Sequence, residues 1–485
     1  MRSHLICVFL LSLCTLSCKN ANNIDFHQDI QAIENGLLPP ILVKGDSVKG
    51  LNLMDRMQHH NVPGVSIALV ENGKLKWAKG YGIANSKTNS TIDTNTLFQA
   101  GSISKPIAAL AALQLVENAQ ITLDADVNDH LIDWKVPESD FTSTQKVTLR
   151  RLLSHTAGTN VHGFPGYAQK DTFPSITAVL NGKGNTPKII VDTIPGSIWR
   201  YSGGGYTIVE KLIEDISGQP FERYMHQQVL QPLGMNNSTY EQPLPPHYHK
   251  NASAAYDTEG SMFEGQWYNH PEQAAAGLWT TPTDLAKYCI QIQEILSGAP
   301  NGILKKPSVE EMLTDQGNDW GLGPSLDEKN GALVFRHAGK NVGFTNEFIA
   351  YAHQGNAVII MTNADNGGKL IGEILRSVSA YYHWDLNNPL TIELMEVNDD
   401  ELSRFTGKYV LDFQVAGIGD YLIDVDLKDN SLRVTDPNNG DINILRPTKK
   451  WEFMDLDKGD KVTFRLEKDS IDILWNNRFL FHKVE

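Results

Sequence analysis

The segment FQAGSISKPIAALAALQLVE, residues 98–117, decides the fold of this chain. It passes from a turn of small residues into a run of alanine and leucine, with Pro106 where the first helical turn tolerates a missing N–H. Ser102 and Lys105 are three residues apart, so on a helix they share one face. A serine hydroxyl becomes a nucleophile when a neighbouring base removes its proton, and a partly desolvated lysine amine is such a base. The segment predicts either this pair or a serine cap followed by a solvent-facing lysine.

The length and charge of the chain limit its class. Its 485 residues predict two or three domains, and the formal net charge of -15 argues against nucleic acid or an anionic membrane surface as the main partner. The partner expected is a small-molecule or peptide substrate. The histidines other than His337, including the pair at His59 and those near His249, follow no metal-ligand spacing, so we expect them at the surface and expect neither a metal nor a cofactor.

The first twenty residues, MRSHLICVFLLSLCTLSCKN, have a short basic start and an apolar run too short to span a bilayer. Residues 1–18 are therefore predicted to be an export signal. The ending TLSC resembles a bacterial lipoprotein signal, with cleavage before Cys18 and lipid on that cysteine; simple secretion is the alternative. Cys289 then remains as the single thiol, which allows no intramolecular disulfide framework. We expect an exported protein, periplasmic or in the outer membrane, that contacts membrane only through the anchor.

Strand patterns occur on both sides of a helical middle. The stretch VPGVSIALVENGKLKWAKGYG, residues 62–82, predicts two strands joined at Asn72-Gly73, a strong hairpin signal. Strands return at residues 332–339, 345–353 and 355–363, and an amphipathic helix follows at 370–382. Residues 19–390 are thus expected to form one α+β domain, an antiparallel sheet flanked by a helical region.

The pattern changes near residue 390. Short strands such as GKYVL, SLRVT and KVTFRL alternate with Asp, Asn, Gly and Lys turns, so residues 391–485 predict a separate all-β domain, a barrel or a sandwich. Four aromatic residues either fill its interior or form a wall beside the active site: Trp451, Trp475, Phe479 and Phe481.

Two further motifs follow the SISK motif. SIWRYSGGGY, residues 197–206, contains Tyr201 in Y-S-G, and RHAGKNVGF, residues 336–344, contains His337-Ala338-Gly339. In this order the three motifs resemble those of the serine β-lactamase and penicillin-binding protein superfamily, particularly its class C β-lactamase and D-peptidase or esterase branch, peptidase family S12. The resemblance spans residues 62–366 and includes LLSHTAG at 152–158 and GLWTTPTDLAKY at 277–288. The C-terminal segment resembles the lipocalin-like domain attached to some members.

The resemblance implies roles for individual residues. Ser102 attacks a carbonyl and becomes acylated, while Lys105 and Tyr201 exchange the proton as general base and acid. The backbone N–H groups of Ser102 and Lys340 form the oxyanion hole. His337 borders the cleft and contacts substrate, and Gly339 lets substrate approach the strand.

Two positions depart from the superfamily pattern. Gly203 stands where an asparagine is common, and His337 stands where a lysine commonly binds a substrate carboxylate. These departures argue against efficient β-lactam hydrolysis. The leading hypothesis is an exported serine hydrolase that cleaves an ester or an amide, with a D-amino-acid peptide among the candidate substrates. The alternatives are a β-lactamase or penicillin-binding DD-peptidase, a covalent sensor and a non-catalytic interaction protein.

Overall fold

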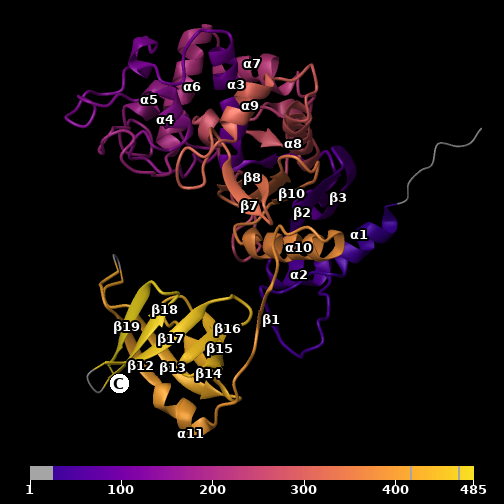
Figure 1. Ribbon diagram of the computed structural model, residues 1–485, viewed down its shortest axis with the longest axis vertical. Helices are drawn as coiled ribbons and strands as arrows, with labels where there is room; N and C mark the ends of the chain where they lie inside the picture. Colours follow the sequence, from indigo (N-terminus) through magenta and orange to yellow (C-terminus); the bar gives the residue numbers. More distant parts are fainter. Residues whose placement is uncertain (1–25, 416–417, 468–469, 485) are drawn as a thin grey trace, which may run out of the picture.

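The computed structural model describes residues 26–415, 418–467 and 470–484, and the expected signal segment with Cys18 lies outside them. A seven-stranded antiparallel sheet has the order β4-β3-β2-β10-β9-β8-β7 (Figure 1). Strands from both ends of the domain therefore meet at the pairing of β2 with β10, as the sequence predicts. The bounds are β2 Gly64–Glu71, β3 Lys74–Asn85, β4 Ser90–Thr91, β7 Ser325–Lys329, β8 Ala332–Asn341, β9 Phe344–Tyr351 and β10 Ala357–Thr362.

The hairpin between β2 and β3 turns at the predicted dipeptide. Asn72 has φ 52° and Gly73 has φ 71°, the left-handed conformation at both central residues that a tight hairpin turn requires. Because β2 is also paired with β10, seven of its eight residues are buried, and the strand reads as a continuous apolar run rather than an alternation.

Helices cover both faces of the sheet. On one face α8 (Pro282–Leu296) packs on the strands, and α3 (Ser104–Glu117) and α6 (Gly203–Ser217) share the larger hydrophobic core with it. On the other lie α1 (His27–Glu34), α2 (Leu53–His59) and α10 (Gly367–Tyr382). Shorter helices complete the helical region: α4 Leu149–Leu153, α5 Ile176–Leu180, α7 Phe221–Met225 and α9 Lys306–Met312. Among the described residues, no helix is long and apolar enough to cross a membrane.

The expectation of surface histidines is wrong at several positions: His155 and His270 are buried, and so are His60 and part of His249. His60 is buried between α2 and α10, where its Nε2 lies 3.0 Å from Glu373 Oε1, and Arg56 Nη2 donates to the same oxygen at 2.7 Å. His249 is half-buried, with Nε2 2.8 Å from the Leu244 carbonyl oxygen. Both side chains thus satisfy local hydrogen bonds in the fold, and no group of His, Cys, Asp and Glu in the described ranges is arranged to hold a metal.

The C-terminal strands form a closed eight-stranded antiparallel barrel, which resolves the choice between barrel and sandwich. Its strands are β12 Gly407–Leu411, β13 Leu422–Lys428, β14 Ser431–Thr435, β15 Ile442–Lys449, β16 Glu452–Asp455, β17 Lys461–Glu467, β18 Ser470–Trp475 and β19 Phe479–Lys483. A short helix, α11 (Asp399–Leu402), and the turn after it precede the first strand. Phe405 of that turn packs against Phe453 and Phe464, so it closes one end of the barrel.

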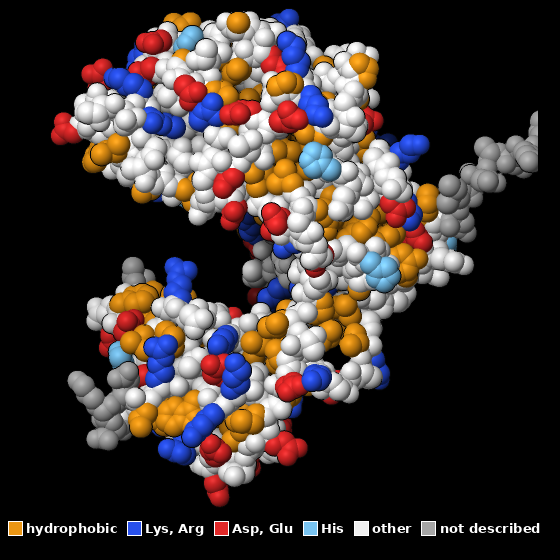
Figure 2. All heavy atoms as spheres, in the orientation of Figure 1, with side chains coloured by type: hydrophobic (Ala, Val, Ile, Leu, Met, Phe, Trp, Pro, Cys, Tyr) orange, Lys and Arg blue, Asp and Glu red, His pale blue; other side chains and the backbone are white. Residues whose placement is uncertain are grey.

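A short parallel pair joins the two parts. β1 (Ile41–Val43) pairs with β11 (Leu390–Ile392), the strand in which the expected boundary at residue 391 falls. The β16–β17 turn also lies near the first part, because a Cβ built on Gly459 comes within 3.7 Å of Pro40. Elsewhere the space-filling view shows a wide hollow between the barrel and the rest of the molecule (Figure 2).

Candidate active site

Ser102 lies in a 3-10 turn, Gly101–Ile103, immediately before α3. Gly101 has φ 56°, and a Cβ there would lie only 2.6 Å from the backbone nitrogen of Lys340 on β8. A Cβ at Gly339 would lie 1.9 Å from the carbonyl oxygen of Ala100. Both positions therefore require glycine, because the turn is pressed directly against the strand. This close approach brings the SISK motif and the H-A-G motif together.

Lys105 is in the first turn of α3 and is only 2% exposed. Its Nζ lies 3.0 Å from Ser102 Oγ and donates a hydrogen bond to the Ala275 carbonyl oxygen at 2.8 Å. The Nζ also lies 5.0 Å from the ring centroid of Tyr201. Burial lowers the pKa of Lys105 to about 7, since no carboxylate compensates for the lost hydration of the ammonium. The solvent-facing lysine considered as the alternative is excluded.

Tyr201 precedes α6, whose N-cap is Ser202, with Ser202 Oγ accepting from the Gly205 N–H at 3.0 Å. Burial raises the pKa of the Tyr201 phenol, and a hydrogen bond with Ser102 opposes that rise without cancelling it. At neutral pH the side chain is therefore a neutral phenol in contact with the serine. Tyr201, from a second segment, therefore lies beside the Ser102–Lys105 pair of the SISK motif.

A group of aromatic and imidazole rings surrounds Tyr201. Ring centroids of His155, His162 and Trp320 lie 4.3, 5.0 and 5.6 Å from that of Tyr201. His155 Nδ1 accepts a hydrogen bond from the Ser202 N–H at 3.1 Å and so ties the turn before α6 in place. Sequence reasoning missed these residues as parts of the site, although His155 stands in the LLSHTAG segment that carries the family resemblance.

His337 is buried, and its ring centroid lies 6.3 Å from Tyr201 and 5.5 Å from Trp320. Nδ1 lies 2.6 Å from the Ala338 carbonyl oxygen, whereas Nε2 has no partner among the described residues. Burial, reinforced by the neighbouring Lys105, lowers its pKa to about 3. The imidazole is neutral at physiological pH and does not supply the positive charge that a lysine has there.

Lys340 and Gly203, two further residues predicted for the site, have different surroundings. The Lys340 side chain points away from Ser102 and forms an ion pair with Asp365. Its backbone nitrogen faces the Gly101 turn. Gly203 is the first residue of α6, and its N–H donates to the His162 carbonyl oxygen at 2.8 Å. A Cβ on Gly203 would lie 3.0 Å from Phe164 Cε2. The Phe164 ring therefore occupies the space next to this glycine.

The sequence model of the Beta-lactamase family matches residues 52–377, well over half of the chain. The chain belongs to this β-lactamase family. All the predicted site residues, except Cys18, fall inside the matched segment.

Other proteins resemble this chain in sequence or in fold. The teichoic acid D-alanine hydrolase of Staphylococcus aureus strain MRSA252 is 25% identical over 287 residues, which cover 58% of this chain and 68% of that protein. The octameric penicillin-binding protein homologue from Pyrococcus abyssi has a TM-score of 0.60 at 21% identity and covers 89% of this chain and 98% of its own. The D-amino acid amidase from Ochrobactrum anthropi SV3 has a TM-score of 0.55 at 19% identity and covers 68% of this chain and 97% of its own. These two structures show a shared fold.

One segment of this β-lactamase-family site carries buried polar groups that the sequence did not point to. Ala275, which accepts from Lys105, follows a buried histidine and a buried glutamate, His270 and Glu272. None of the side-chain nitrogens of His270 or oxygens of Glu272 has a partner among the described residues. Burial lowers the pKa of His270 to about 4 and raises the pKa of Glu272 to about 8. Both side chains are therefore neutral at pH 7, in the segment that leads to the Ala275 carbonyl oxygen bonded by Lys105.

Proposed function

We propose that this chain is an exported serine hydrolase that forms an acyl-enzyme on Ser102 and cleaves an ester or amide of a D-amino acid. The observation that carries the proposal is the pair of Ser102 Oγ and Lys105 Nζ, 3.0 Å apart, with a lysine pKa of about 7. A base whose pKa lies near the working pH is present in its neutral form and still binds a proton readily.

In acylation, Ser102 Oγ forms a bond to the substrate carbonyl carbon and its proton passes to Lys105. The neutral amine keeps an N–H for the Ala275 carbonyl oxygen and presents its lone pair to the hydroxyl. The substrate oxygen becomes an oxyanion between the backbone N–H groups of Ser102 and Lys340, which the close approach at Gly101 brings together. Tyr201, kept as a phenol, donates a proton to the leaving group as the carbon–heteroatom bond breaks.

In deacylation a water molecule attacks the acyl carbon and the same groups act in reverse. The Tyr201 phenolate accepts the proton of that water, and the Lys105 ammonium returns its proton to Ser102 Oγ as that oxygen leaves. The cycle consumes one water and regenerates the free serine, so multiple turnover distinguishes this hydrolase from a covalent sensor.

The substrate class follows from the two positions that depart from the superfamily pattern. Neutral His337 offers no charge for the carboxylate of a β-lactam, and Gly203 offers no side-chain amide for a substrate N–H. Esters have no N–H and lose little from this change. The similarity to the Staphylococcus aureus teichoic acid D-alanine hydrolase supports a D-aminoacyl group on the acyl side.

The proposal is tested by Ser102→Ala, which we expect to abolish covalent labelling by a serine-reactive fluorophosphonate and all turnover of a D-alanyl ester. The matched control is Ser104→Ala, because Ser104 Oγ is buried in backbone hydrogen bonds to Gly101 and Leu278. Ser104→Ala should still be labelled, with the adduct mapped to Ser102 by mass spectrometry. A label on folded Ser102→Ala protein, or an adduct on Ser104 or Ser202, would show that the nucleophile is misassigned.

A further inference from the structure

The open end of the C-terminal barrel holds a cavity of about 510 Å³, here called the barrel pocket. It lies at the end opposite to the one that Phe405 closes, among the turns β12–β13, β14–β15, β16–β17 and β18–β19. Cavities of this size accommodate small organic molecules, and barrel mouths are among their preferred places.

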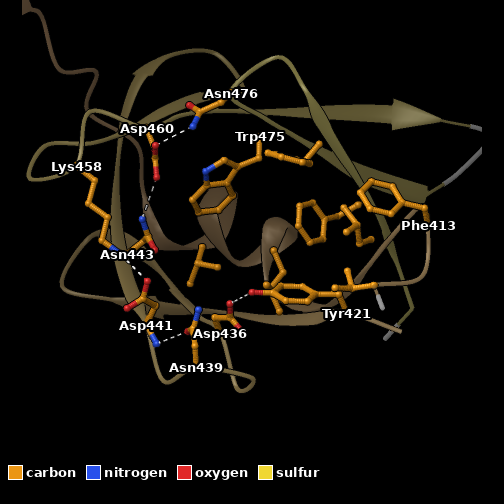
Figure 3. A pocket seen from close by; sticks show the side chains of 16 residues that line it. Phe413, Tyr421, Asp436, Asn439, Asp441, Asn443, Lys458, Asp460, Trp475 and Asn476 are labelled. Carbon is orange, nitrogen blue, oxygen red and sulfur yellow. Dashed lines mark hydrogen bonds and ion pairs between the residues drawn. The ribbon is translucent and has the colours of Figure 1, made fainter. Parts of the chain in front are cut away.

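The barrel pocket has two chemically different sides (Figure 3). Trp475, Tyr421 and Phe413 point into it from one side, above inward-facing aliphatic residues such as Ile423 and Val434. Trp475 and Tyr421 are only half-buried, and Phe413 is 52% exposed. A closed barrel of this strand number ordinarily fills its interior with its own side chains, so apolar surface left open inside it favours an apolar occupant.

Two hairpin turns of the same geometry build the polar side. In DPNNGD (436–441) the Asp436 N–H donates to the Asp441 carbonyl oxygen at 2.8 Å; in DLDKGD (455–460) the Asp455 N–H donates to the Asp460 carbonyl oxygen at 2.9 Å. In each turn the first aspartate accepts from the backbone N–H two residues on, at 2.9 Å. The last aspartate of each turn, Asp441 or Asp460, is thereby left on the polar side of the pocket (Figure 3).

The polar side carries an excess of negative charge. Its lining includes the carboxylates of Asp436, Asp441 and Asp460 but a single ammonium, that of Lys458. Lys458 Nζ donates to Asn443 Oδ1 at 3.1 Å and lies 3.5 Å from Asp441. Arg478, in the β18–β19 turn, stacks 4.9 Å over the Phe479 ring instead of joining the lining.

Hydrogen bonds hold the carboxylates in place without neutralising them. Asp460 accepts from Asn476 Nδ2 at 2.7 Å and from Asn443 Nδ2 at 3.4 Å, and both donors are uncharged amides. Asp436 accepts from the Tyr421 hydroxyl, and this hydrogen bond, together with burial, raises the pKa of Tyr421 to about 12. The phenol therefore remains a neutral donor, and the local field stays negative.

We propose that the barrel pocket binds a small amphipathic cation, with its amine or quaternary ammonium group at Asp436, Asp441 and Asp460 and its apolar part against Trp475 and Tyr421. An aromatic face beside carboxylates suits an alkylammonium group, which gains both charge pairing and contact with the ring. The proposal is independent of the hydrolase reaction, because it concerns only residues of the barrel.

The experiment is isothermal titration calorimetry of the purified full-length protein with octyltrimethylammonium and with octyl sulfate, two probes with the same chain and opposite charge. We expect one saturable site for the cation and at least ten-fold weaker binding of the sulfate. Absence of saturable binding of the cation to folded protein, or equal binding of the sulfate, would overturn the proposal.

Substitutions locate the site. Asp441→Asn combined with Asp460→Asn leaves one carboxylate against one ammonium, and we expect about ten-fold weaker binding of the cation. The remaining oxygen at position 460 can keep the shorter hydrogen bond from Asn476, whereas the longer one from Asn443 is lost. The control is Asp424→Asn, which removes a charge on β13 next to inward-facing Ile423 and thus outside the pocket. A second variant, Val434→Trp, fills the cavity and should remove binding of the cation in protein that circular dichroism shows to be folded. Binding unaffected by the paired substitution or by the filled cavity would place the ligand elsewhere.

Discussion

At the residue scale, the S-x-x-K spacing put Ser102 and Lys105 on one helix face, but by itself it left open whether the lysine contacts the serine or faces solvent. The depth at which Lys105 is buried could not be predicted from the segment. It depends on rings that arrive from residues far along the chain, Tyr201 and Tyr206, whose centroids lie 5.0 and 5.7 Å from its Nζ. The same limit explains why the burial of His337 was not predicted along with its expected contact to substrate: its ring packs beside Trp320, which lies in a loop without a motif.

The pKa of Lys105 predicts the pH profile of the reaction. The neutral amine is the active form, so kcat/KM for a D-alanyl ester should rise about ten-fold per pH unit below pH 7 and level off above it. The raised pKa of Tyr201 predicts no fall from that residue up to about pH 10. The measurement is kcat/KM from pH 5.5 to 9.5, with circular dichroism confirming the folded state at each pH. A profile that is flat across pH 7 would exclude Lys105 as the base.

Gly203 predicts which substrates are preferred. We expect wild-type protein to cleave a D-alanyl ester with higher kcat/KM than the matched anilide, by roughly five-fold or more, since a missing hydrogen bond costs about 1 kcal/mol. Gly203→Asn alone should lower both rates, because its side chain meets the Phe164 ring at 3.0 Å and the His162 carbonyl oxygen at 3.1 Å.

Combining Gly203→Asn with Phe164→Ala makes room for the asparagine side chain. We expect this double variant to show a smaller difference in kcat/KM between the ester and the anilide than wild type does. Phe164→Ala by itself is the control and should leave that difference unchanged. A wild-type preference for the anilide or for a chromogenic cephalosporin would instead favour a peptidase or a β-lactamase.

At the scale of elements, strands with clear apolar patterns were predicted within a few residues of their bounds, as for β8, β9 and β10. Two barrel strands were not predicted. β15 contains Pro447, which lacks a backbone donor, and its pairing with β16 shifts register between Pro447 and Lys449. β16 itself has only four residues, too few to show alternation. The segment from His270 to Gly277 was likewise not predicted as part of the site, because its contact with Lys105 is made by a backbone oxygen, that of Ala275, and not by a side chain.

The buried glutamate of that segment predicts a pH-dependent stability. Folding raises the pKa of Glu272 from 4.5 to about 8, so folded protein keeps the proton that the unfolded chain loses between those values. Stability therefore falls as pH rises from about 4.5 to 8. Glu272→Gln removes the titration and should be more stable than wild type at pH 8.5 by roughly 2–5 kcal/mol, at about 1.4 kcal/mol per pKa unit. Urea unfolding at pH 5 and pH 8.5 measures the free energy of unfolding of both proteins. If the variant differs from wild type by the same amount at both pH values, Glu272 is not neutral in the folded protein.

At the scale of the whole molecule, the sequence predicted an α+β domain followed by an all-β domain, because the strand patterns of the two parts differ. Long apolar runs mark a sheet covered on both faces, whereas short alternating strands mark a barrel with one face in water. The barrel pocket was not predictable, since it depends on how four turns distant in sequence gather at one end. The aromatic residues divide accordingly: Trp451 packs against Phe405 at the closed end, whereas Trp475, Phe479 and Phe481 line the pocket.

The proposed lipid anchor predicts how the whole molecule distributes in the cell. If Cys18 is acylated, the lipid is the attachment to membrane, because no helix in the described ranges could span one and the net charge is -15. Cys18→Ser should move the protein from the membrane fraction to the soluble fraction and leave its specific activity unchanged, since the site lies far along the chain at Ser102. Cys14→Ser is the matched control: it alters a cysteine of the same signal segment, four residues earlier, and should leave the protein in the membrane fraction. Fractionation followed by mass spectrometry of the N-terminal peptide measures both the distribution and the acyl mass. Cys18→Ser protein that stays in the membrane fraction, or wild-type protein that is soluble without an acyl group, would favour simple secretion instead.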